Sequence, residues 1–454
     1  MREGLVDCPG GSITRLTRFP TRAYTRMQST AEPAAAHLIA SRDCAELTTA
    51  VSSSSAASPD LESGLAPFDP NGTAPAPRFK QLRRAYGFDE VAIVPGDVTI
   101  NPELVELGLD IGPHHFEVPF LASAMDAVVD PRFAIEMHRA GGLAVLNLEG
   151  VWTRYDDPAA MLQEVASASR DEATLILQNA YQAPIRDDLI ARRIQEIKEG
   201  GAVAAVSVTP MNTKHMAPIV QDAGADILVV QSTVTTARHE SNSIEGLRFD
   251  KLFKDISIPV VVGNTVGFAA TLEIMRTGVA GILVGVGPGA ACTSREVLGI
   301  GVPQVTATID CAAARDYFLR ETGRYVPIIT DGGIRTGGDV SKCFASGADG
   351  VMMGSPFAAT AEAPGRGYHW GMATPHANLP RGTRVAVGVN TTIRKTLYGP
   401  TSRTDGTENL VGALRTAMGV CGAHTIREFQ QAEMVIAPAI KTEGKIYQFA
   451  QSQA

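Results

Sequence analysis

Val284–Thr306 reads VGVGPGAACTSREVLGIGVPQVT and continues the apolar run Gly281–Val284. A short apolar run that ends in glycines is typical of a buried parallel strand. Gly287 and Gly289 leave backbone N–H and carbonyl groups uncovered by side chains, so these groups can face an ion or an anion. Cys292 follows, and a loop of this kind can present one thiol at the mouth of a barrel.

The neighbours of Cys292 favour a reactive thiol. Thr293 and Ser294 offer hydroxyls that can relay a proton, and Arg295 can favour thiolate over thiol. The alternative is a small buried hydrophobe, which is the common role of a lone intracellular cysteine. The glycine-rich context favours the reactive interpretation.

From Phe79 onward, an apolar strand, a turn and an amphipathic helix recur along the chain. Helical periodicity lies between the strands, for example over 188–199 and 271–277. Eight units over about 240 residues predict an α/β fold, a (β/α)8 TIM barrel. A doubly wound sheet is the competing fold, but no G-x-G-x-x-G follows the first strand. The expected strands are Val118–Ala122, Leu143–Leu148, Val203–Val208, Ile227–Gln231, Pro259–Gly263, Gly281–Val284, Val326–Thr330 and Gly350–Met353.

The composition is that of a chain able to bury a large core, since 44% of its 454 residues are apolar. A net charge of −8 argues against a general nucleic-acid surface, although a local basic pocket for a phosphate stays open. No apolar run reaches 18 residues, so no membrane span is expected. The six cysteines show no CxxC and no metal-ligand spacing, which fits a reducing, cytoplasmic setting.

Residues 1–77 differ from the rest of the chain, because they are rich in Ser, Ala, Thr and Pro. Such a composition cannot offset its ordering entropy, so we predict a disordered, low-complexity extension before a single catalytic domain at 78–454. The first thirty residues are rich in arginine and poor in acids, as targeting peptides are. An untargeted tail, or a start at Met27, is the favoured alternative.

The stretch around Cys292 resembles the catalytic loop of the IMP dehydrogenase/GMP reductase family, whose pattern is G-x-G-P-G-x-x-C-T-T-R followed by G-x-G-x-P-Q. The resemblance extends over roughly Phe79–Gln448. Most dehydrogenases of the family carry a paired CBS regulatory module after the second barrel strand. Here only about fifty-five residues separate Leu148 from Val203, and helices with one short strand would use them. The chain therefore resembles the CBS-less, IMP dehydrogenase-related branch, with a flap and a tail near its C-terminus.

Two motifs end the seventh and eighth expected strands. Ile329–Arg335 carries an acid that can accept both hydroxyls of a ribose, and then a glycine pair whose N–H groups can meet a phosphate. Val351–Ser355 ends the next strand with another turn of backbone donors, although either motif alone could be structural. The resemblance implies that Asp331 holds the ribose and that the phosphate is held by Gly333, Gly354 and Ser355.

The resemblance assigns further substrate residues. Ser123 and Met125, within S-A-M-D, line the nucleotide pocket in the family, with a packed methionine as the alternative. His369 stands where the family has a tyrosine phosphate ligand, and it could equally be a surface or core histidine. Met372 completes the following G-M pair. The serine that often precedes the nucleophile by two residues is Ala290 here.

Cofactor, cation and subunit contacts also follow from the resemblance. Asn264 borders the purine and the nicotinamide, while Gln231 and Ser232 lie at the cofactor-ribose position. Because Gln231 replaces an acid, a repulsion against a 2′-phosphate is lost, which favours NADPH over NAD. Gly287, Gly289 and Cys292 match carbonyl ligands of a monovalent cation, usually K⁺. The stretch 412–419 matches a region that suggests a homotetramer, an expectation by analogy.

Both activities of the family attack purine C2 with a thiolate, and the dehydrogenase then hydrolyses the adduct with an Arg-Tyr pair on its flap. No Arg-Tyr pair occurs between Trp370 and Val385. We therefore predict a GMP reductase: Cys292 attacks GMP, Ser294 and Glu362 help ammonia leave, and NADPH delivers hydride to give IMP.

Two alternatives to the reductase stay open. The first is an IMP dehydrogenase that uses NAD, with Arg381 or Arg384 activating water. The second is a purine-nucleotide-binding regulator that kept the pocket and lost turnover, which the departures at Ala290, Gln231 and His369 favour.

Overall fold

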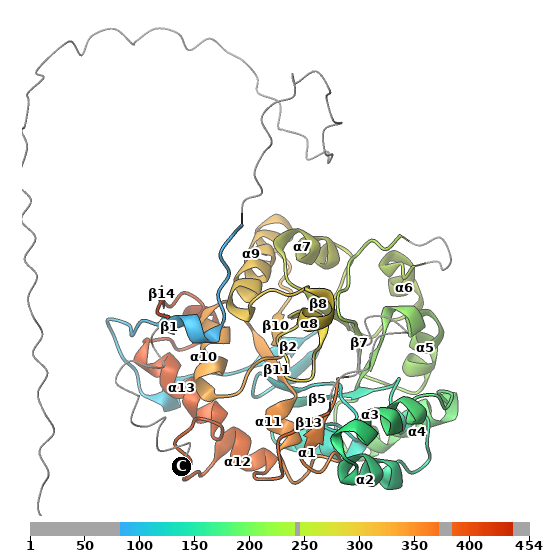
Figure 1. Ribbon diagram of the computed structural model, residues 1–454. Helices are drawn as coiled ribbons and strands as arrows, with labels where there is room; N and C mark the ends of the chain where they lie inside the picture. Colours follow the sequence, from blue (N-terminus) through green and yellow to red (C-terminus); the bar gives the residue numbers. More distant parts are fainter. Residues whose placement is uncertain (1–81, 241–245, 372–383, 439–454) are drawn as a thin grey trace, which may run out of the picture. The chain divides into compact units, whose positions relative to one another are not determined.

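Eight parallel strands close into a barrel in the computed structural model, which describes residues 82–240, 246–371 and 384–438 (Figure 1). Closure follows because β4 pairs with both β5 and β11, and β10 pairs with both β9 and β11. The predicted (β/α)8 barrel is confirmed, and the doubly wound sheet is excluded. The barrel strands are β4 (Phe120–Ala122), β5 (Leu143–Asn147), β6 (Ala205–Val208), β7 (Ile227–Gln231), β8 (Val260–Thr265), β9 (Gly281–Val284), β10 (Ile328–Asp331) and β11 (Gly350–Met353).

Helices follow the strands and cover the outside of the barrel (Figure 1). Local capping sets where several begin: the Asp130 carboxylate accepts from the Phe133 N–H at 2.6 Å, and the Thr336 hydroxyl accepts from the Asp339 N–H at 3.2 Å. The helices after β4 to β10 are α1 (Pro131–Arg139), α4 (Asp187–Glu199), α5 (Pro210–Asp222), α6 (Phe249–Asp255), α7 (Phe268–Arg276), α9 (Gln304–Thr322) and α10 (Gly337–Ala345). After β11 come α11 (Ser355–Ala358), α12 (Ile393–Tyr398), α13 (Leu410–Val420) and α14 (Ile426–Phe429).

A small hairpin fills one end of the barrel. Strands β2 (Leu109–Ile111) and β3 (His114–Phe116) pair antiparallel, and their apolar side chains belong to the same buried cluster as the inward-facing residues of the barrel strands. The hairpin lies where the strands begin: a Cβ on Gly350, the first residue of β11, would lie 3.0 Å from the Leu109 side chain. The opposite end of the barrel, where the strands finish, is not filled by this hairpin and is the end at which barrels of this class bind their ligands.

The segment between β5 and β6 is entirely helical and irregular. It contains the 3-10 turn η3 (Val151–Thr153), then α2 (Ala159–Ser167), α3 (Arg170–Ala180) and α4. The expected short strand between Leu148 and Val203 is therefore wrong, and no CBS module occupies this position. The expected helices at 188–199 and 271–277 correspond to α4 and α7 within a few residues.

Short strands outside the barrel tie distant parts of the chain together. β1 (Val91–Ile93) pairs antiparallel with β14 (Met434–Ile436), which joins the start of the domain to its C-terminal part. β12 (Tyr368–His369) pairs with β13 (Val385–Ala386) on either side of residues 372–383. The predictions for residues 1–77, for Met372 and for Arg381 lie outside the described residues. Within the described part of the chain, no helix is both long and apolar enough to cross a membrane.

Candidate functional site

A cavity of about 1350 Å³ opens at the end of the barrel where the strands finish. This volume exceeds the range of about 300–1,000 Å³ that a single small ligand usually occupies. Apart from Glu362 and Arg384, the candidate residues within the described part of the chain line it: Ser123, Met125, Gln231, Ser232, Asn264, Gly287, Gly289, Cys292, Ser294, Asp331, Gly333, Gly354, Ser355 and His369.

The loop after β9 brings the thiol and a hydroxyl together. Cys292 Sγ lies 3.3 Å from Ser294 Oγ, and the Cys292 N–H donates to the Gly289 carbonyl at 3.0 Å. Ser294 is buried at the start of the short helix α8 (Ser294–Leu298), while Cys292 is partly exposed. The thiol therefore faces the cavity with a proton-relay group fixed beside it.

Arg295 supports the loop from behind. Its guanidinium donates to the Val302 carbonyl at 3.1 Å, and its stem passes so close to Gly287 that an added Cβ would lie 2.6 Å from Arg295 Cγ. Gly287 also has φ of 80°, a conformation that favours glycine. The contacts of Arg295 thus serve loop geometry, whereas the sequence suggested that it stabilises the thiolate.

Asp331, at the end of β10, is the centre of an amide cluster. Asn264 Nδ2 and Gln231 Nε2 both donate to its Oδ2 atom, at 2.8 and 3.0 Å, and Gln231 Nε2 also lies 3.0 Å from Asn264 Oδ1. Burial raises the pKa of the Asp331 carboxyl to about 6, and the two amide donors oppose that rise. Gln231 and Asn264 were predicted on the cofactor side, but their side chains turn to the predicted ribose acid.

Gln304 is a site residue that sequence reasoning missed. Its Nε2 donates to the Val284 carbonyl at 2.7 Å and to the Asp331 carbonyl at 3.0 Å, so it joins the ends of β9 and β10. Its Oε1 is buried without a hydrogen-bond partner in the described structure. The only sequence signal was its place as the final glutamine of the G-x-G-x-P-Q pattern.

The predicted phosphate corner is built by two turns and a histidine. Ser355 Oγ lies 2.8 Å from His369 Nε2, and a Cβ on Gly354 would meet Met125 Sδ at 2.8 Å. Burial lowers the pKa of His369 to about 4, so its ring is neutral near pH 7. His369 Nδ1 is buried without a partner among the described residues. His369 Nε2 therefore lies where it can orient the Ser355 hydroxyl, and both side chains line the cavity.

Glu362 lies outside the wall of the cavity. Its Oε2 accepts from the Ile393 N–H at 3.1 Å, which caps the start of α12. Of the two arginines predicted to activate water, Arg384 is the one that the structure describes. Its guanidinium donates to the Val165 carbonyl, and its Cζ lies 4.5 Å from the centroid of the Tyr368 ring. Neither side chain reaches the thiol in this arrangement.

The loop of Gly287, Gly289 and Cys292 fits a monovalent cation only in part. The Gly289 carbonyl already accepts from the Cys292 N–H, which leaves one lone pair for an ion. Across the residues that the structure describes, no cluster of three or more His, Cys, Asp or Glu side chains could hold a metal ion. A cation here would depend on backbone oxygens.

Known proteins match this chain over most of its length. Residues 85–445 match the IMP dehydrogenase / GMP reductase domain. An uncharacterized oxidoreductase of Mycobacterium leprae is 40% identical over 364 residues, covering 78% of this chain and 97% of the relative. Inosine-5'-monophosphate dehydrogenase of Cryptosporidium parvum is 27% identical over 379 residues, covering 77% of this chain and 91% of the relative. The crystal structure of an IMP dehydrogenase/GMP reductase-like protein from Corynebacterium glutamicum is 36% identical with a TM-score of 0.74, covering 79% of this chain and 95% of that one.

Proposed function

The chain belongs to the IMP dehydrogenase/GMP reductase family of oxidoreductases, and on that premise we propose that it acts at C2 of a purine nucleoside 5′-monophosphate through a covalent adduct on Cys292. One observation carries the proposal. A single cavity holds the Cys292–Ser294 pair, the ribose acid Asp331 and the Ser355–His369 corner. Nucleophile, ribose acceptor and phosphate donors are the three groups that such a substrate requires.

Of the two directions in the family, we propose the reductive one, with GMP as substrate. The Cys292 thiolate adds to C2, the 2-amino group leaves as ammonia after protonation, and a thioimidate remains. Bound NADPH supplies the hydride. The C2–S bond then breaks to give IMP and the free thiolate. In sum, GMP, NADPH and two protons give IMP, NADP⁺ and ammonium.

The reductive direction is supported by what surrounds the thiol. Arg384 is held on the Val165 carbonyl and the Tyr368 ring, so it is not placed to activate water. Ser294, 3.3 Å from Cys292, is the hydroxyl placed to pass a proton to the departing amine. The Glu362 carboxylate is bound to the Ile393 N–H at the start of α12, so it would join this relay only after a rearrangement.

The second candidate is IMP dehydrogenase, in which IMP, NAD and water give XMP. Two observations favour it. Glu362, the acid expected to assist ammonia loss, caps α12 outside the cavity wall. The Cryptosporidium parvum relative is named an inosine-5'-monophosphate dehydrogenase. A regulator that binds nucleotide without turnover is the third candidate, favoured by Ala290 and Gln231.

The deciding experiment follows absorbance of the reduced nicotinamide in paired reactions, GMP with NADPH and IMP with NAD. Loss of signal with ammonia release in the first reaction would establish the reductase. A rise in the second alone would establish the dehydrogenase, and binding of either nucleotide without any change would identify a regulator. Cys292→Ala that retains turnover would overturn both enzymatic directions.

The choice of cofactor, the need for a monovalent cation and the oligomeric state are tested in further experiments. The cavity is large enough for nucleotide and nicotinamide together, and we propose NADPH because Gln231 carries no charge. Replacing K⁺ by a large organic cation tests the loop of Gly287, Gly289 and Cys292. Light scattering tests the proposed homotetramer, to which the face of α13 would contribute.

A further inference from the structure

A helical hairpin packs against the wall of the cavity from outside. The hairpin of α2 and α3 contributes to a small buried cluster that includes Leu162, Val165 and Leu177. The same cluster contains Trp370, which follows His369 in the chain and is only 1% exposed. The cavity wall at His369 and Gly371 is therefore anchored outward through the indole between them.

One hydroxyl oxygen connects this wall to a buried carboxylate. Trp370 Nε1 donates to Tyr181 Oη at 2.9 Å, and Tyr181 Oη donates to Asp126 Oδ2 at 2.6 Å. Asp126 is fully buried and also accepts from the Val151 N–H at 2.7 Å and from Asn147 Nδ2 at 3.2 Å. Removing the Tyr181 oxygen would leave a buried indole donor and a buried carboxylate each short of a partner.

Trp370 and Asp126, the two residues that Tyr181 connects, are each adjacent in sequence to a residue of the predicted phosphate corner. Trp370 is bonded in sequence to His369, whose Nε2 lies 2.8 Å from Ser355 Oγ. Asp126 follows Met125, which packs against Gly354. Tyr181 itself does not line the cavity, so it touches no ligand. A shift of the indole would move the histidine that orients Ser355.

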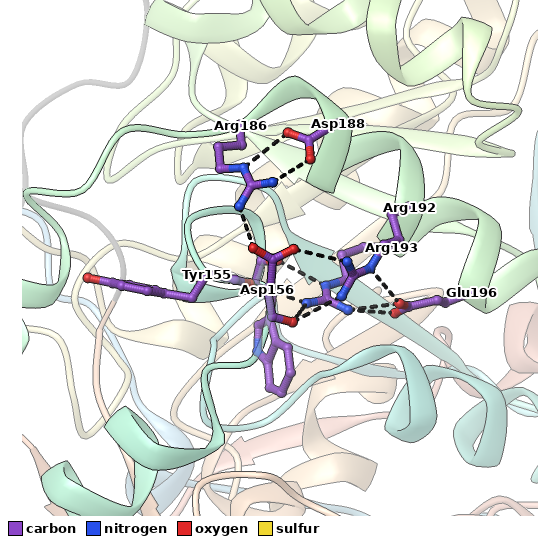
Figure 2. Close-up of polar contacts among 8 residues, drawn as sticks. Tyr155, Asp156, Arg186, Asp188, Arg192, Arg193 and Glu196 are labelled. Carbon is purple, nitrogen blue, oxygen red and sulfur yellow. Dashed lines mark hydrogen bonds and ion pairs between the residues drawn. The ribbon is translucent and has the colours of Figure 1, made fainter.

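The loop before α2, which precedes the hairpin, is tied to α4. Figure 2 shows Asp156 bridging Arg186 at 2.5 Å and Arg192 at 3.0 Å, which ties the loop before α2 to α4. Arg193 is nearly fully buried and donates to the carbonyls of Trp152 and Asp156 at 3.0 and 2.7 Å. Because buried residues of α4 belong to the main hydrophobic core, these contacts hold the loop before α2 against the domain.

Strand β13, which pairs with the β12 strand that carries His369, is also held by the α2–α3 hairpin. Arg384 lies just before β13, which pairs with β12 through the His369–Val385 register. Its guanidinium donates to the Val165 carbonyl at the end of α2 and lies 4.5 Å from the centroid of the Tyr368 ring. The hairpin therefore holds the β12–β13 pair from both strands.

From these contacts we propose that Tyr181 is a positioning residue for the nucleotide phosphate, acting through Trp370 and His369 on Ser355. The helical hairpin between β5 and β6 is then a fixed part of the substrate site. This inference rests on the proposed function, because it assumes a nucleoside 5′-monophosphate as ligand. It assigns no chemical step to Tyr181.

The test compares Tyr181→Phe with the matched control Tyr155→Phe. Tyr155 lies on the same segment and packs on the same cluster, but its hydroxyl donates to the Ala180 carbonyl at 2.9 Å, whereas the Trp370 indole donates to Tyr181. We expect Tyr181→Phe to raise the KM for the 5′-monophosphate about tenfold, with kcat changed less than about twofold. Binding of the matching nucleoside, which lacks the phosphate, should not change. Tyr155→Phe should leave KM unchanged even if it lowers thermal stability.

Tryptophan emission gives a second measurement, because the chain has two tryptophans, Trp152 and Trp370, and both belong to this network. Emission should change in Tyr181→Phe and not in Tyr155→Phe. If Tyr181→Phe does not fold, Trp370→Phe removes the indole donor together with part of the buried ring, and should show the same rise in KM. Equal KM in wild type and Tyr181→Phe, or equal rises in both tyrosine variants, would overturn the inference. Absence of nucleotide binding by the wild type would instead overturn the proposed function.

Discussion

Asp331→Asn should make the free protein more stable while weakening its hold on the substrate. Burial raises the pKa of the Asp331 carboxyl from 3.8 to about 6. Near neutral pH the folded protein therefore carries a buried negative charge that lowers its stability. A shift of about two units corresponds to roughly 3 kcal/mol, which is the upper limit of the stabilisation. Both amide donors reach the same oxygen, Oδ2, so an asparagine oxygen can accept both hydrogen bonds.

The pH dependence gives the direction of the effect. The folded-state pKa lies above the unfolded one, so ionised Asp331 destabilises the fold increasingly as pH rises through about 6. Below about pH 4 the carboxyl is neutral in both states, and the cost disappears. The thermal midpoint of Asp331→Asn should therefore exceed that of wild type by a few degrees at pH 7.5 and converge with it near pH 4.

Substrate binding should change in the opposite sense. A neutral amide loses one charge-assisted hydrogen bond to the ribose, worth roughly 2 kcal/mol, or about thirtyfold in Kd. Calorimetric titration with GMP and IMP measures this loss, and Asp97→Asn, at an exposed position, serves as the control. A lower midpoint for Asp331→Asn at pH 7.5, or a difference independent of pH, would refute the reasoning.

Two further predictions concern the loop and the far end of the barrel. Gly287→Ala should reduce kcat at least about tenfold, because φ of 80° and the contact with Arg295 both oppose a Cβ. Gly267→Ala is the control: its Cβ would meet no atom within 4 Å, so kcat should not change. Steady-state rates of both variants measure the difference. Asp349→Ala should lower stability by about 3 kcal/mol, because buried Arg315 loses the nearer of its two carboxylate partners, at 2.8 Å from Nη1, and the buried Ile328 N–H loses its acceptor. Urea unfolding measures this, and an unchanged midpoint would contradict it.

The barrel could be predicted because its strands are buried on both faces and appear as short apolar runs. Ile227–Gln231, Gly281–Val284 and Gly350–Met353 begin and end where expected, and the other strands shift by one or two residues at their ends. The short strand expected before Val203 failed because an apolar run of helical period also suits a buried strand.

The site was less predictable, because sequence assigns a residue to a strand end but does not orient its side chain. Gln231 ends its strand as expected, yet its amide turns to Asp331, 100 positions away. Trp370 and Tyr181 lie 189 positions apart, and no pattern in the chain links them. Glu362 has the residue type that the family motif requires, but its hydrogen bond to Ile393 is a tertiary contact.

The β2–β3 hairpin has a consequence for the order in which ligands bind and leave. Because its apolar side chains fill the end of the barrel where the strands begin, the part of the chain that the structure describes leaves the opposite opening as the route for a ligand. Asp331 belongs to a barrel strand, so a nucleotide bound to it occupies the floor beneath that opening. A second ligand stacked above would block the exit of the first. Arrival and departure would then follow a compulsory order, with the deeper molecule first to arrive and last to leave.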